Sequence, residues 1–190
     1  MDEMLNRLTA ILALVNDWLK YAEAKNAILL GFSGAGLTVV VTYSSTASNI
    51  PNSVKFGCLL ATILLNVCSL ICSLSFLPKT DLEVIVWKKK HPNRRNKGDI
   101  RDDDNLYYFG CLYKYQAHEL VDAINRLYLE SSIQNARKKE YLDLASQVSV
   151  NSEIAYLKFK IFSWALYTLI LSLLSIPIVM IISLIFRHSI

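Results

Sequence analysis

The sequence predicts an all-α integral membrane protein, with three transmembrane helices and a small helical cytoplasmic region between the second and the third. The 190-residue chain is 53% hydrophobic and has a mean hydropathy of +0.33, which is too apolar for an ordinary small soluble domain. Three long runs without any charged residue account for the excess, and many of the lysines and arginines fall in the segment between the last two runs.

Residues 1–26 are predicted to form a cytoplasmic amphipathic helix. Apolar residues recur at steps of three and four, as one face of a helix requires. They are Met4 or Leu5, Leu8, Ile11 or Leu12, Val15, Leu19 and Ala22. No glycine or proline separates this segment from the first run. It therefore either continues into the first transmembrane helix or lies along the membrane surface.

The first run, Ala27 to Tyr43, contains the stretch GFSGAG (31–36), which superficially resembles two enzyme motifs. A nucleophile elbow at Ser33 would need glycine at position 35, where alanine stands. A phosphate-binding loop would need Lys-Ser or Lys-Thr after the last glycine. Seventeen residues without charge are long enough to cross the hydrocarbon, so we expect a membrane helix. Small residues at Ala27, Gly31 and Ala35 then predict a face for close helix packing.

The second and third runs are also predicted to span the membrane. Residues 56–77 form a hairpin with the first span, within a region 27–77. Residues 161–186 are 26 residues long, about 39 Å at ~1.5 Å per residue, which is enough to cross with some tilt. Pro177 is expected to kink this last helix without ending it, because transmembrane helices tolerate proline.

The distribution of positive charge predicts the orientation. Ser44 to Val54, between the first two spans, has no charge, whereas KKKHPNRRNKGDIR follows the second span. The positive-inside rule then places the N-terminus and residues 78–160 in the cytoplasm, and the tail 187–190 in the periplasm. We expect no cleavable signal peptide. Residues 78–160 carry 15 Lys and Arg against 12 Asp and Glu, which fits topology or anionic lipid better than nucleic acid.

The cytoplasmic region is predicted to be helical after a charged loop at 88–104. An aromatic segment, Asn105 to Tyr115, leads into a helix with an apolar face of Leu120, Ile124 and Leu127. A last helix is expected to begin near Ser131 or Ser132 and to enter the third span without interruption. About 80 residues make a small core, so we expect support from oligomerisation or from the membrane-proximal helices.

Neither a metal site nor a catalytic site is predicted. Cys58, Cys68 and Cys72 fall within the second span, where small apolar packing is the favoured interpretation. The three histidines form no set with a nucleophile and an acid along the sequence. We expect no enzymatic activity and no cofactor.

The order of these motifs resembles the transmembrane effectors of Pycsar, a bacterial antiphage system. The similarity covers roughly residues 16–186 and rests on four features in order. They are AEAKNAILLGF before and within the first span, FLPK at the end of the second, NLYYFG at 105–110, and Ile154, Tyr156, Lys158 and Phe159 before the third. Glu23 and Asn26 depart from the family's usual aspartate and alanine.

The resemblance implies a non-enzymatic effector of the bacterial inner membrane. In that family, a partner pyrimidine cyclase makes cyclic CMP or cyclic UMP during infection. The nucleotide activates the effector, which impairs the inner membrane and kills or arrests the cell. The expected partners are therefore the cyclic nucleotide, the lipid bilayer, a functionally paired cyclase and further copies of the chain, without nucleic acid.

A cyclic mononucleotide brings one negative charge and a planar base, so its receptor needs a cation or amide for the phosphate and an aromatic or amide for the base. The candidates are Arg94, Arg95, Lys97, Asn105, Tyr107, Tyr108 and Lys114. Each has a structural alternative. The basic residues serve topology, the tyrosines and Phe109 form core around the last helix, and Asn105 caps a helix.

Two other functions compete with the effector. One is a constitutive structural or regulatory membrane subunit without a nucleotide ligand. The other is a lipid-cleaving enzyme that uses Ser33.

Overall fold

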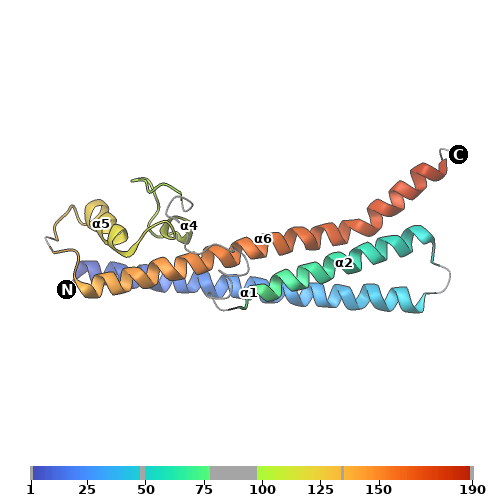
Figure 1. Cartoon of the computed structure of the whole chain (residues 1–190), viewed down its shortest axis with the longest axis horizontal. Helices are drawn as coiled ribbons and strands as arrows, with labels where there is room; N and C mark the ends of the chain where they lie inside the picture. Colours follow the sequence, from blue (N-terminus) through green and yellow to red (C-terminus); the bar gives the residue numbers. More distant parts are fainter. Residues whose placement is uncertain (1, 48–49, 78–97, 134, 189–190) are drawn as a thin grey trace, which may run out of the picture. The chain divides into compact units, whose positions relative to one another are not determined.

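The structure, a computed structural model, describes residues 2–47, 50–77, 98–133 and 135–188, and within these every regular element is a helix. In chain order they are α1 (Glu3–Thr46), α2 (Asn52–Leu74), α4 (Phe109–Leu112), α5 (Ala117–Tyr128) and α6 (Lys139–His188), labelled in Figure 1. Three of them, α1, α2 and α6, are long and apolar enough to cross a membrane. The predicted fold class, all-α with three spanning helices, is confirmed.

The chain divides into two compact units. Unit 1 comprises Met1–Ala22 and Pro78–Phe159, and unit 2 comprises Glu23–Leu77 and Lys160–Ile190. Helix α1 is continuous from Glu3 to Thr46, so the first 26 residues continue into the helix that contains the first apolar run. Both α1 and α6 contribute residues to each unit.

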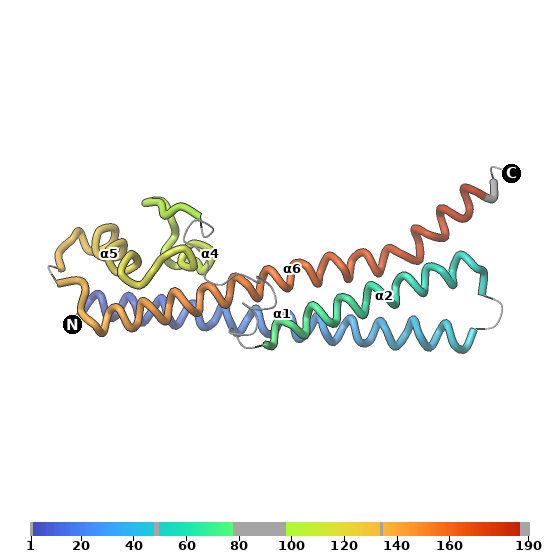
Figure 2. Tube along the Cα trace, in the orientation of Figure 1, coloured from blue at the N-terminus to red at the C-terminus, as the bar shows by residue number. Residues whose placement is uncertain are grey.

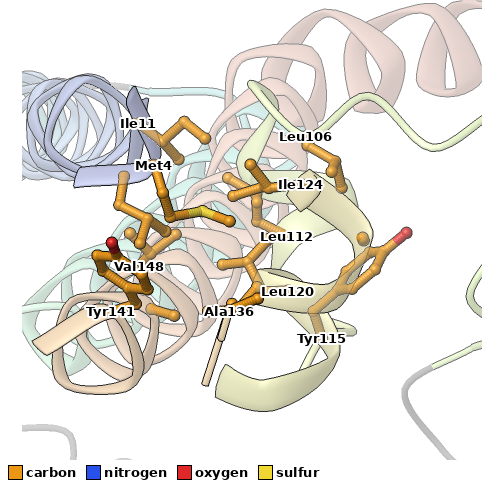
Figure 3. Packing of buried hydrophobic residues seen from close by; sticks show 14 of the residues in the cluster. Met4, Ile11, Leu106, Leu112, Tyr115, Leu120, Ile124, Ala136, Tyr141 and Val148 are labelled. Carbon is orange, nitrogen blue, oxygen red and sulfur yellow. The ribbon is translucent and has the colours of Figure 1, made fainter. Parts of the chain in front are cut away.

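The core of unit 1 joins the start of α1 to α4, α5 and the start of α6. Figure 3 shows Met4 and Ile11 of α1 and Val148 of α6 packed with Leu112 and Ile124. Most of the stripe predicted for the first helix is buried, with the three- and four-residue steps that a helical face requires, but the predicted member Leu19 is only partly buried. The buried residues of α1 are Met4, Leu8, Ile11, Val15 and Ala22.

Helix α5 begins at a reciprocal capping box. The backbone N–H of Gln116 donates to Glu119 Oε2 at 3.0 Å, while the Gln116 side chain receives the backbone N–H of the same glutamate. Leu120 and Ile124 are buried as predicted, but the predicted third core residue, Leu127, is 37% exposed. Val121 and Ala123 complete the buried face instead.

The predicted start of the last helix is wrong by about two turns. Helix α6 begins at Lys139, because Glu130 and Ser131 adopt positive φ angles of 49° and 58°, which break a right-handed helix. Asn125 then holds the following turn. Its Nδ2 donates to the Ile133 carbonyl at 3.1 Å, and its Oδ1 accepts the Ile133 N–H at 3.3 Å. From Lys139 onward the helix runs without a break, as the sequence predicts.

Helix α2 of unit 2 contacts both long helices through small or polar side chains. Ser69 Oγ and Ser33 Oγ of α1 are hydrogen-bonded at 2.9 Å, and Cys68 Sγ donates to the Ala165 carbonyl of α6 at 3.3 Å. A Cβ added to Gly57 would stand 3.1 Å from the Cα of Ile176, so α2 and α6 meet at backbone distance there. Small residues thus allow the close helix contact that membrane bundles favour.

Pro177 lies inside α6, as predicted, and does not end it. Figure 2 shows that α6 changes direction toward its C-terminal end. A proline cannot donate a hydrogen bond to the carbonyl four residues earlier, and its ring crowds that carbonyl, so a bend is the expected result.

Candidate functional site

The NLYYFG segment forms a turn that leads into α4. Asn105 Oδ1 accepts a hydrogen bond from the backbone N–H of Tyr107, two residues later, at 2.9 Å, which forms an Asx-turn. The cap position of α4 itself is Tyr108, whose side chain makes no capping bond. Asn105 therefore stabilises the turn before the helix, and the expectation that it caps a helix is wrong by three residues.

Phe109 of this segment is a core residue. It is 5% exposed and stacks on Phe159 of α6, with ring centroids 4.9 Å apart and an interplanar angle of 13°. Trp18 of α1 packs against both rings, at 5.6 Å and 6.3 Å. The expected aromatic packing around the last helix is thus found for Phe109. Tyr107 and Tyr108 are instead 37% and 44% exposed.

The two exposed tyrosines have different neighbours. The Tyr108 ring lies against Phe109, with centroids 4.6 Å apart, and over the backbone of Gly110. Tyr107 packs edge-on against Tyr128, the last residue of α5, with centroids 5.9 Å apart and an interplanar angle of 84°. Its hydroxyl accepts a hydrogen bond from Arg7 Nη1 of α1 at 3.4 Å.

Lys114 is bound to a carboxylate. Its Nζ donates to Asp104 Oδ1 at 2.8 Å, and the two side chains are only 18% and 7% exposed. Asp104 Oδ2 also accepts the backbone N–H of Arg101 and lies 3.1 Å from the Tyr115 hydroxyl. Burial alone would raise the pKa of Asp104, but these donors outweigh it and lower that pKa below its usual value. Burial, together with the charge of Asp104, raises the pKa of Tyr115.

The predicted ligand residues are therefore engaged with three different sets of neighbours. Lys114 belongs to the Asp104 network, Tyr108 to Gly110 and Phe109, and Tyr107 to Arg7 and Tyr128. Arg94, Arg95 and Lys97 lie outside the described residues. The predicted set as a whole is not tested by this geometry and stays a prediction.

Arg7 is a candidate that the sequence analysis missed. Besides the bond to Tyr107, its Nη2 donates to Glu3 Oε1 at 3.0 Å, and its Cζ stands 5.5 Å from the centroid of Tyr128. Its Nε is buried without a hydrogen-bond partner, an arrangement that is unfavourable for a polar group. One signal could have found it. Arg7 lies three residues after Met4 and four before Ile11, at the border of the apolar stripe, where a charge faces neighbouring elements.

The small residues Ala27, Gly31 and Ala35 lie on an exposed face of α1. A Cβ added at Gly31 would meet nothing within 4 Å, whereas one at Gly36 would stand 3.5 Å from Leu65. Packing inside the chain therefore uses other positions of α1. The predicted packing of Ala27, Gly31 and Ala35, which concerns contact between chains, stays a prediction.

The GFSGAG stretch is helical throughout, so neither a nucleophile elbow nor a phosphate-binding loop is formed there. Ser33 Oγ is hydrogen-bonded to the Leu30 carbonyl at 2.9 Å and to Ser69 Oγ. No histidine or carboxylate is among these partners. Within the part of the chain that the structure describes, no cluster of His, Cys, Asp or Glu could hold a metal ion.

Comparison with known proteins gives a consistent assignment. The family model described as the Pycsar effector protein domain matches residues 7–186. The chain is also 26% identical over 151 residues to the Pycsar effector protein RsPycTM of a Rhizobium species, covering 78% of each chain. No solved structure matches. Together with the three apolar helices, the family match shows that the chain belongs to the Pycsar effectors, membrane proteins of antiphage defence that act with a cyclase and its cyclic nucleotide.

Proposed function

We propose that the chain is a non-enzymatic effector activated by cyclic CMP or cyclic UMP, and that it impairs the integrity of the bacterial inner membrane until the infected cell dies or stops growing. The observation that carries this proposal is the family match over residues 7–186, which includes both units. The nucleotide is made by the partner cyclase. The chain itself contributes recognition and a membrane-spanning bundle.

Unit 2 has the properties that the membrane part of such an effector needs. Large apolar side chains are exposed on all three of its helices, among them Phe32, Leu70 and Leu173. Many of its hydroxyl groups are hydrogen-bonded within the bundle, which lowers the cost of placing them in lipid. Several serines and threonines of its helices bond back to carbonyls of the preceding turn, for example Thr62 to Cys58 and Ser172 to Leu169.

Cations next to aromatic rings support a membrane boundary at the start of unit 2. Lys25 Nζ stands 5.2 Å from the centroid of Phe162, and Lys160 Nζ stands 5.4 Å from that of Trp164. Aromatic and basic residues are enriched at headgroup level, where the ring is buried and the charge remains hydrated. The proposed orientation has unit 1 on the cytoplasmic side, where the nucleotide is made.

Continuous helices provide a route for the signal. Both α1 and α6 have residues in unit 1 and in unit 2, so a rearrangement around either helix in unit 1 can be passed along it. A ligand shifts a two-state equilibrium only by its preference for one state, and an almost complete switch needs about 5.5 kcal/mol. One small nucleotide supplies only part of that. Several coupled sites supply the rest, which is why we propose a homo-oligomer.

The proposal is tested in cells that express the chain without its cyclase. Cyclic CMP, cyclic UMP and cyclic AMP are each delivered from a separately induced cyclase, and a potential-sensitive dye reports the membrane potential. The effector should depolarise cells only with a pyrimidine nucleotide. Depolarisation that is equal with and without nucleotide, or absent in every case, would favour a constitutive structural or regulatory subunit.

A further inference from the structure

We propose that the Arg7 cluster, defined as Arg7, Tyr107 and Tyr128, is where the cyclic pyrimidine nucleotide binds, with the Arg7 guanidinium on the phosphate and the Tyr107 ring on the base. This inference rests on the proposed function and assigns its recognition step to particular side chains. It lies entirely within unit 1.

The cluster joins three separate segments of the chain. Arg7 comes from the second turn of α1, Tyr107 from the turn before α4, and Tyr128 from the end of α5. A ligand that contacts all three affects how these segments pack. Because Arg7 stands on one of the two helices shared by both units, binding there is directly coupled to a helix that enters unit 2.

The guanidinium has unused donor capacity. A guanidinium carries five N–H groups in a planar fork, which suits the two oxygens of a phosphodiester. Nε has no hydrogen-bond partner, and the bond from Nη1 to the Tyr107 hydroxyl is long, at 3.4 Å. The carboxylate that pairs with Arg7 belongs to Glu3, which is 64% exposed and can turn into solvent when an anion arrives.

A partly exposed aromatic side chain lies beside this cation. Tyr107 is 37% exposed and is held edge-on against Tyr128, so one pyrimidine ring can stack on it. Two other described cations of unit 1 lack this combination. Lys138 stands over Tyr141, but that ring is only 2% exposed, and Lys114 is bound to the buried carboxylate of Asp104.

The test is calorimetric titration of the full chain in detergent with cyclic CMP and cyclic UMP. Arg7→Gln should weaken binding at least tenfold, because it removes the positive charge and the paired N–H donors of the guanidinium. The matched control is Arg126→Gln, which removes an arginine paired with an exposed carboxylate, Asp102, and should bind like the parent. Tyr107→Leu should weaken binding more than Tyr108→Leu, which alters the neighbouring tyrosine.

Glu3→Gln distinguishes binding from a purely structural role. If Arg7 binds the phosphate, removing its competing carboxylate should tighten binding two- to fivefold. If Arg7 has only a structural role, through its hydrogen bonds to Glu3 and Tyr107, Glu3→Gln should instead lower the thermal unfolding midpoint without tightening nucleotide binding. This variant keeps the guanidinium, so it remains informative even if Arg7→Gln does not fold.

The outcomes separate the site from the function. A parent that binds, with Arg7→Gln binding equally well or Glu3→Gln binding no more tightly, overturns the Arg7 cluster and leaves the proposed function intact. A parent that binds neither cyclic CMP nor cyclic UMP overturns the proposed function itself, and the site with it.

Discussion

The ring of Tyr108 occupies the space that a side chain at Gly110 would need. A Cβ added to Gly110 would stand 2.3 Å from Cε1 and 2.8 Å from Cζ of that ring. The glycine of the NLYYFG segment is therefore required by the packing of a tyrosine two residues earlier. Gly110 is not among the described glycines with a positive φ, so its backbone conformation does not require glycine.

Gly110→Ala should push the Tyr108 ring outward without unfolding α4. The ring is 44% exposed and can rotate away, while alanine gains up to about 1 kcal/mol in helix propensity. Site-resolved nitration by mass spectrometry should show faster modification of Tyr108 than in the parent. Gly34→Ala, at a position with nothing within 4 Å, is the control. Unchanged nitration would mean that the ring does not rest on the glycine.

Asp104→Asn should reduce both the stability of unit 1 and its sensitivity to acid. Hydrogen bonds to a charged group contribute about 1.5–3 kcal/mol, and this carboxylate receives one from Lys114. Because its folded pKa is lowered, its contribution is complete above the ordinary aspartate value of about 3.9 and is lost as pH falls through the lower folded value.

The measurement is the unfolding midpoint of the detergent-solubilised chain from pH 7 to pH 2.5. Asp104→Asn should lower the midpoint at pH 7 and flatten its decline below about pH 4. Asp103→Asn, at an exposed neighbour, should match the parent throughout. Parallel acid profiles for all three proteins would contradict the role assigned to Asp104.

Two glycines of unit 2 should respond differently to leucine. Gly57→Leu should destabilise the chain itself, because Ile176 of α6 stands in the way. Gly31→Leu should leave the stability of the single chain unchanged, since nothing lies within 4 Å, yet weaken association and abolish toxicity. Crosslinking in membranes and growth assays measure both. If Gly31→Leu keeps its oligomers and its toxicity, that face only contacts lipid.

The double variant Val150→Gly/Asn151→Gly should bind nucleotide but no longer depolarise cells. Two glycines cost roughly 1 kcal/mol each in helix propensity and soften α6 inside unit 1. Asn151 Nδ2 also donates to Asn16 Oδ1 of α1 at 2.8 Å, so Asn151→Ala is the control that removes this bond and keeps the helix. Depolarisation equal to the parent would show that α6 does not transmit the signal.

Local patterns were sufficient to predict the helices. Uncharged runs of 17 to 26 residues predict the spanning segments, and the apolar stripe from Met4 to Ala22 predicts the buried face of α1. Both depend on residues close together along the chain. The start of α6 was mispredicted because positive φ angles at Glu130 and Ser131 carry no clear sequence signal when neither residue is glycine.

The candidate site could be predicted only in part, because its contacts join distant positions. Tyr107 was named from its residue type, but its partner Arg7 is 100 residues away along the chain. The close contact of Gly57 with Ile176 likewise depends on how α2 and α6 pack. Lys114 was named as a ligand residue because the sequence does not reveal that Asp104 folds back onto it.

The central claim is that a cyclic pyrimidine nucleotide makes this chain impair a membrane. The most direct measurement is dye release from liposomes that contain only the purified full-length protein. The account predicts release that depends on cyclic CMP or cyclic UMP and does not occur with cyclic AMP or with protein-free liposomes. Release that is independent of nucleotide, or no release with either pyrimidine nucleotide, would contradict it.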